Sequence, residues 1–116
     1  MENLNELELS ILNELSFKHP SITCHIPFLR VLNREITGVG MYVNLCYLET
    51  TKNIPSIDIS VCAISTNESI KVPNLKYGLA YEVNITDDRI DFIEFVTYGN
   101  EVWDGNTDGL SLSRKN

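Results

Sequence analysis

The sequence predicts an α+β fold, with N-terminal helices packed on one face of an antiparallel sheet of about four to five strands. Apolar residues recur every three or four positions near the N-terminus, which is typical of an amphipathic helix. After Arg34 they recur at every second position, which is typical of strands with one buried face. The 116 residues fit a single domain, residues 1–116, with a frayed tail at about 111–116.

The first helix is predicted from one apolar stripe. It consists of Leu4, Leu7, Ile11, Leu12 and Leu15. The acids of the same region lie largely off this stripe: Glu2, Glu6, Glu8 and Glu14. We expect the helix to end at His19-Pro20, because the residue before a proline avoids the helical conformation.

Residues 22–32 are ambiguous. Phe28, Leu29 and Leu32 fit a short helix opened by Pro27 in its first turn.

Four strands are predicted from two-residue alternation, at about 41–48, 57–63, 77–85 and 90–97. The short link Thr86–Arg89 makes the last two a hairpin. Glycine and Asp/Asn residues predict a loop from Gly99 to Gly109.

The last strand has large apolar side chains in both phases. Ile90, Phe92 and Val96 share one predicted face, and Ile93 and Phe95 share the other. One face packs on the core, and the other is covered either by this chain or by a partner. Asp91 and Glu94 are out of phase, so we expect them on different faces.

The negative charge lies in one segment. The chain has 16 acids and 9 bases, a formal charge of −7. Between Glu82 and Asp108 one base, Arg89, accompanies these acids: Glu82, Asp87, Asp88, Asp91, Glu94, Glu101, Asp104 and Asp108. Such a field attracts a basic partner and repels nucleic acid and anionic membranes.

Several classes of site are not indicated. The three cysteines, Cys24, Cys46 and Cys62, are predicted to be reduced, buried thiols, because no export signal or membrane span is evident. We therefore expect a cytoplasmic protein. His19 and His25 fit surface or capping positions better than a metal site. We expect no catalytic residues, metal or cofactor.

Three segments carry a resemblance to a known family. They are Arg34–Gly40 (Arg-Glu-Ile-Thr-Gly-Val-Gly), Gly78–Tyr81, and Asp91–Trp103, which includes Thr-Tyr-Gly-Asn-Glu-Val-Trp. This pattern resembles a group of small bacterial proteins, some similar to immunity proteins of contact-dependent growth inhibition and related toxin systems. The match spans about residues 26–104. The chain departs from the pattern at Phe95-Val96, and Asp104 replaces a proline. The resemblance implies a cytoplasmic, toxin-neutralising protein without enzymatic chemistry.

The leading hypothesis is an immunity protein that binds a basic toxin domain, plausibly a nuclease, through an acidic surface. The expected contact residues are Asp87, Asp88, Asp91, Glu94, Tyr98, Glu101, Trp103 and Asp104. Tyr98 and Trp103 would anchor the partner, or would instead close the core. The alternative is a small ligand-binding domain or enzyme with a site near Thr37–Gly40 and Tyr98–Trp103. Its polar groups would be Arg34, Glu35 and Glu94.

Overall fold

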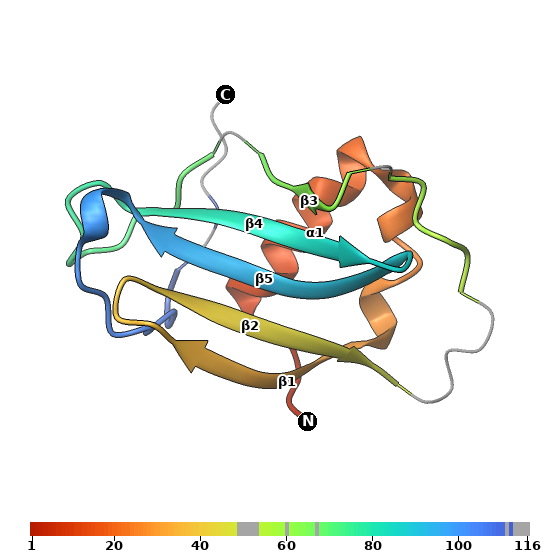
Figure 1. Cartoon of the computed structure of the whole chain (residues 1–116), viewed down its shortest axis with the longest axis horizontal. Coiled ribbons are helices and arrows are strands. Elements are labelled where there is room, and N and C mark those ends of the chain that lie inside the picture. Colours follow the sequence, from red (N-terminus) through yellow and green to blue (C-terminus); the bar gives the residue numbers. More distant parts are fainter. Residues whose placement is uncertain (49–53, 60, 67, 111, 113–116) are drawn as a thin grey trace.

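The computed structural model describes residues 1–48, 54–59, 61–66, 68–110 and 112. They form one antiparallel sheet of five strands in the order β1-β2-β5-β4-β3, with one α-helix behind it (Figure 1). The strands are β1 (Leu29–Ile36), β2 (Gly40–Tyr47), β3 (Ala63–Ile64), β4 (Leu79–Thr86) and β5 (Arg89–Thr97). The predicted α+β architecture is confirmed.

The helix α1 (Glu6–Lys18) buries four of the five residues of the predicted stripe, and the fifth, Leu4, is buried just before the helix begins. Asn5 caps its N-terminus, and the His19 N–H bonds the Leu15 carbonyl at its end. The stripe packs against the inward side chains of β2, β4 and β5, which include Val43, Val83 and Ile93. No helix in the described part of the chain combines the length and apolar content needed to cross a bilayer.

The expected short helix at Phe28–Leu32 is wrong. Ile26–Phe28 forms a single 3₁₀ turn that contains Pro27, and β1 begins at Leu29. An irregularity between Val31 and Asn33 shifts the pairing of β1 with β2 and leaves Leu32 exposed. The shift breaks the alternation of apolar residues, and this hid the strand in the sequence.

The expected strand at 57–63 is reduced to the two residues of β3. Ile57 is buried, Asp58 exposed and Ile59 half-buried, but none of them lies in a strand. The alternation of apolar residues therefore reflects an extended segment that lies on the core here. It does not indicate whether another strand pairs with this segment. Ser60, within the predicted strand, and most of the predicted tail at 111–116 lie outside the described residues.

The cysteines are free thiols, but the expectation that they are buried is wrong. Cys24 and Cys62 are exposed, and Cys46 is half-buried. Cys24 lies in a turn and Cys62 precedes β3, so neither side chain reaches the core.

The glycines of the Thr37–Gly40 segment have backbone roles. Gly38 has φ +91° in the β1–β2 turn, as the turn interpretation requires. At Gly40 a Cβ atom would lie 2.1 Å from the Phe95 carbonyl oxygen of β5. The motif therefore allows close approach of two strands.

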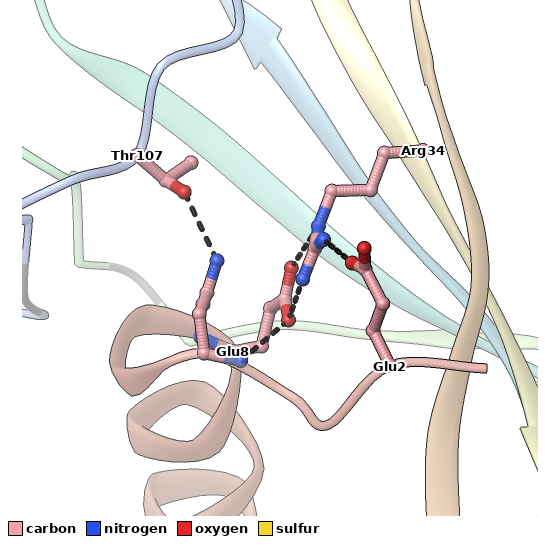
Figure 2. A network of polar contacts seen from close by, with 5 residues as sticks. Glu2, Glu8, Arg34 and Thr107 are labelled. Carbon is pink, nitrogen blue, oxygen red and sulfur yellow. Dashed lines mark hydrogen bonds and ion pairs between the residues drawn. The ribbon is translucent and has the colours of Figure 1, made fainter.

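Glu8 is fully buried, in contrast to its expected position off the apolar stripe. Its carboxylate accepts from Arg34 Nε at 3.0 Å, Arg34 Nη2 at 2.9 Å and the Asn5 backbone N–H at 2.9 Å. Figure 2 shows Glu2 on the other side of the guanidinium, where its Oε2 accepts from Arg34 Nη1 at 2.7 Å. The Asn5 side chain also donates to Thr107 Oγ1 at 3.0 Å. The network joins α1, β1 and the C-terminal loop.

Replacing Arg34 with Met should lower the free energy of unfolding by about 3 kcal/mol, because the buried Glu8 charge loses its partner. Glu2→Gln should cost less than about 1 kcal/mol, since Glu2 is 72% exposed. Urea unfolding measures both. Arg30→Met is the matched control, because the Arg30 side chain donates to the Pro27 and Leu29 carbonyls and forms no ion pair with any described acid. Equal losses for Arg34→Met and Arg30→Met would contradict the assignment.

Candidate functional site: an acidic, uncovered sheet face

One face of the sheet has no helix on it, because α1 lies behind β1, β2, β5 and β4 in Figure 1; Met1 reaches this face at Cys46, where the two sulfur atoms lie 3.2 Å apart. We call the outward side chains of these strands the open face. Its members include Arg30, Asn33, Glu35, Tyr42, Asn44, Cys46, Ala80, Glu82, Asn84, Phe92, Glu94 and Val96, as their pairings show. All of them are exposed or half-buried.

A row of polar side chains crosses the open face. Glu35 pairs with Tyr42, Tyr42 with Glu94, and Glu94 with Glu82. The hydrogen bond from Tyr42 to Glu94 raises the pKa of Tyr42, and the charges of Glu94 and Glu35 raise it further. The ring of Tyr42 also packs edge-on against Phe92, with centroids 5.6 Å apart. Three carboxylates and two aromatic rings thus share one patch.

Glu82 and Glu94 are direct cross-strand neighbours. Like charges in this relation are destabilising, because Cβ atoms of opposed residues lie about 5 Å apart. No described base forms an ion pair with either one, since the only ion pairs found there join Arg34 to Glu2 and Glu8. Among the described residues this pair of negative charges on the open face has no counterion.

A bulge in β5 adds Asp91 to this face. Asn84 pairs with Phe92 and Ile85 with Ile90, so Asp91 is the extra residue. Its Oδ2 lies 3.2 Å from Thr86 Oγ1, which in turn lies 2.9 Å from the open-face Asn84 Oδ1. The expectation that Asp91 and Glu94 lie on different faces is therefore wrong.

The same bulge changes which apolar side chains of β5 share a face. Ile90 was expected to share a face with Phe92 and Val96. It is instead buried together with Ile93 and Phe95. Strict alternation fails here because one residue has no partner on β4.

Asp87 and Asp88 occupy the β4–β5 turn, and both are exposed. Their φ angles are +50° and +59°. These values belong to a two-residue hairpin turn in which Asn and Gly are favoured, and Asp tolerates the conformation better than most residues. The turn therefore presents two adjacent carboxylates to solvent.

The Tyr47 side chain contacts the two residues that follow this turn, Arg89 and Ile90. Its hydroxyl accepts from the Ile90 N–H at 2.9 Å, and the Arg89 guanidinium lies 4.6 Å from its ring centroid. The hydroxyl proton then points to His25 Nδ1, also at 2.9 Å. His25 Nε2–H donates to the Pro55 carbonyl at 2.7 Å. These contacts connect the turn to residues 54–59.

His25 is buried, so its expected place at the surface is wrong, whereas it does occupy the N-cap position of the Ile26–Phe28 turn, without a hydrogen bond from its side chain to that turn. Burial lowers its pKa and the charge of Arg89 lowers it further, against a smaller opposing effect of the Pro55 hydrogen bond. A neutral ring suits its partners, because Nδ1 must accept from Tyr47. His19 ends α1 as expected.

The other predicted contact residues lie past the opposite end of β5. Glu101 accepts from the backbone N–H groups of Lys76 at 2.9 Å and Tyr77 at 3.1 Å, so it holds the segment before β4. Trp103 is 4% exposed and packs edge-on against Phe95. Asp104 accepts from the Asn106 N–H, whereas Tyr98 is 43% exposed.

The eight predicted contact residues therefore do not form one patch. The β4–β5 turn and Trp103 lie at opposite ends of β5, a strand about 30 Å long (Figure 1). Asp91 and Glu94 on the open face lie between them. Trp103 fills the core, as the second interpretation of this residue expects.

The alternative site is brought together only in part. The Thr97 N–H bonds the Val39 carbonyl at 2.8 Å, and the Trp103 N–H bonds the Gly38 carbonyl at 2.9 Å, so the two segments are in contact. Arg34, however, binds Glu8 on the helix side, whereas Glu35 and Glu94 lie on the open face. A hollow of about 320 Å³ includes Val102 and Trp103 but none of these polar groups.

A larger hollow, of about 470 Å³, lies at the β4 and β5 part of the open face. It is lined by Ser65, Thr66, Ala80, Tyr81, Glu82, Glu94 and Val96. Burial raises the pKa of Tyr81, and its hydroxyl bonds Thr66 Oγ1. Within the described ranges no group of three His, Cys, Asp or Glu side chains could hold a metal ion.

The fold and site define a small α+β domain with one uncovered, acidic sheet face. Comparison with protein-family models, curated proteins and solved structures finds no match in any of the three. The resemblance to toxin-immunity proteins therefore stays a prediction.

Tyr42, Glu82 and Phe92 were not among the expected site residues, and Glu35 was expected only in the alternative ligand-binding site. Glu82 lay within the acidic segment but was counted only as charge. Strand pairing places these four beside Glu94, and neither spacing nor composition specifies that pairing.

Replacing Glu82 with Gln should raise the free energy of unfolding by about 0.5 kcal/mol, because it removes the like-charge contact with Glu94. Thermal or urea unfolding measures the gain. Asp58→Asn is the matched control, since Asp58 is an exposed acid away from the open face. It removes the same charge from the chain without relieving Glu94. An equal gain in both variants would mean that only net charge matters.

Acid should destabilise the protein through His25. The pKa of His25 is lowered in the folded state, so the unfolded chain binds more protons as pH falls below about 6.5. The free energy of unfolding should therefore decrease between about pH 7.5 and about pH 5.5. Urea titrations at both values test this. His25→Gln keeps a donor for Pro55 and should flatten the dependence; an unchanged slope would contradict the role of His25.

Proposed function

We propose that this protein is a bacterial, cytoplasmic immunity protein that binds and neutralises a basic toxin domain, plausibly a nuclease. The observation that carries the proposal is the uncompensated acidic surface of the open face and the β4–β5 turn. Glu82, Glu94, Asp87 and Asp88 form no ion pair with any described base. The resemblance of the Arg34–Gly40 and Asp91–Trp103 segments to toxin-immunity proteins points in the same direction.

The mechanism is electrostatic capture followed by occlusion. Carboxylates on the open face present the charge that a nuclease normally meets on the phosphates of its substrate. Complementary charge accelerates encounter and fixes the register of the complex. The aromatic pair Tyr42–Phe92 lies within this surface and supplies the apolar contact area that interfaces favour.

The predicted contact residues fall into two groups, according to whether the side chain is exposed or already makes contacts within the protein. Asp87, Asp88, Asp91, Glu94 and Tyr98 are exposed or half-buried, so they remain available to a partner. We assign the other three, Glu101, Trp103 and Asp104, to positioning the C-terminal loop. Glu35 and Glu82 join the first group through the sheet register.

Co-expression with the product of the gene immediately upstream tests the proposal. If that product arrests growth, this protein should restore growth and co-purify with it. A non-toxic neighbour, or a toxic one that is neither neutralised nor bound, would overturn the proposal.

Matched charge variants test the surface. Asp87→Asn/Asp88→Asn should slow association with the toxin several-fold at low salt, because it removes two steering charges. Asn is chosen because it tolerates the positive φ of both positions. The control Glu6→Gln/Asp58→Asn removes two exposed acids elsewhere and should change the rate little. Equal effects of the two pairs would reject a role for the turn.

A further inference from the structure

The hollow on the open face has a defined lining. Ala80 and Val96 are cross-strand neighbours, next to the Glu82–Glu94 pair on the same two strands. The small side chain of Ala80 leaves space between these two pairs. Ser65 and Thr66, which follow β3, border the edge of β4. They are fixed there, because Ser65 Oγ donates to the Tyr81 carbonyl at 2.6 Å and Thr66 Oγ1 bonds the Tyr81 hydroxyl.

The lining combines apolar surface with two carboxylates. Val96 is 40% exposed, which is high for a strand residue in the middle of a sheet. Glu82 and Glu94 face each other without a counterion in the described part of the chain. An occupant with a flat apolar surface and a positive charge would bury the exposed surface of Val96 and neutralise the two carboxylates.

Four of the bases that the structure describes are engaged outside the hollow. Arg34 binds Glu8 and Glu2 behind the sheet, Arg89 lies over the Tyr47 ring, and Lys76 lies over the Tyr77 ring. Arg30 donates to the carbonyls of Pro27 and Leu29. No lysine or arginine of the described residues lines the hollow, so a cation there can be supplied by another molecule.

Arginine fits this environment better than lysine. Its planar guanidinium has five N–H donors, so it can bond two carboxylates at once, and its weakly hydrated faces pack on apolar and aromatic groups. Tyr42, hydrogen-bonded to Glu94 and packed on Phe92, lies next to the pair and offers such a ring. Lysine presents a compact, strongly hydrated charge that uses the apolar lining less well.

We propose that the open face is the docking surface and that its Glu82–Glu94 hollow receives an arginine side chain of the partner protein. The choice of a protein partner rests on the proposed function. The choice of arginine rests on the charge and shape of the hollow. Neutralising the opposed carboxylates turns a destabilising contact of the free protein into a favourable one of the complex.

NMR titration of the full chain with N-acetyl-arginine methylamide tests the hollow without the toxin. Amide shifts should concentrate at Ala80, Glu82, Glu94 and Val96. The citrulline analogue has the same shape without the charge and should leave these amides unshifted. The lysine analogue should bind several-fold more weakly than the arginine analogue.

Glu82→Gln should weaken binding of the arginine probe by about fivefold, because one of two carboxylates is lost. Asp58→Asn is the control and should bind the probe as the wild type does, since Asp58 is an exposed acid outside the hollow. The amide spectrum of each variant verifies its fold.

Three results would overturn the hollow as an arginine site: no shifts there, equal shifts with citrulline or lysine, or shifts spread evenly over all exposed acids. The outcome is separable from that of co-expression. A probe that binds while the neighbouring gene product is not neutralised preserves the hollow and rejects the immunity function. Neutralisation with no response of the hollow preserves the function and rejects the docking site.

Discussion

A single α-helix covers a five-stranded sheet, and it can cover only one face. The stripe of α1 packs on the inward side chains of β2, β4 and β5, so those positions are apolar. The outward positions face water, and they hold the carboxylates and the Tyr42–Phe92 pair. The division into a structural face and an available face follows from this constraint.

The distribution of bases makes the open face acidic. Arg34 lies on β1 with its guanidinium turned to the buried Glu8, where it stabilises the packing of α1. Because Arg34 is used behind the sheet, it leaves Glu35 and Glu94 without its charge in front. The same net charge of −7 would produce a less one-sided electrostatic field if the bases were spread evenly over both faces of the sheet.

The residues that carry the family resemblance have mostly structural roles. Gly40 admits the Phe95 carbonyl, Trp103 fills the core beside Phe95, and Glu101 holds the segment before β4. Asp87 and Asp88 lie outside the pattern of the resemblance and are exposed.

The sequence by itself determined α1, β2 and the β4–β5 hairpin, because regular apolar periods and a short turn signal specify them locally. It also located the negative charge. It did not determine β1, because the alternation of apolar residues in that strand is broken at Leu32. It also did not place Asp91 and Glu94 on the same face, because their shared face depends on one residue of β5 that has no partner on β4. The burial of Glu8 and His25 was decided only in the tertiary structure, since a polar side chain is buried where distant partners such as Arg34 and Pro55 satisfy it. The opposed carboxylates of Glu82 and Glu94 likewise exist only through strand register, which brings together residues that no local pattern connects.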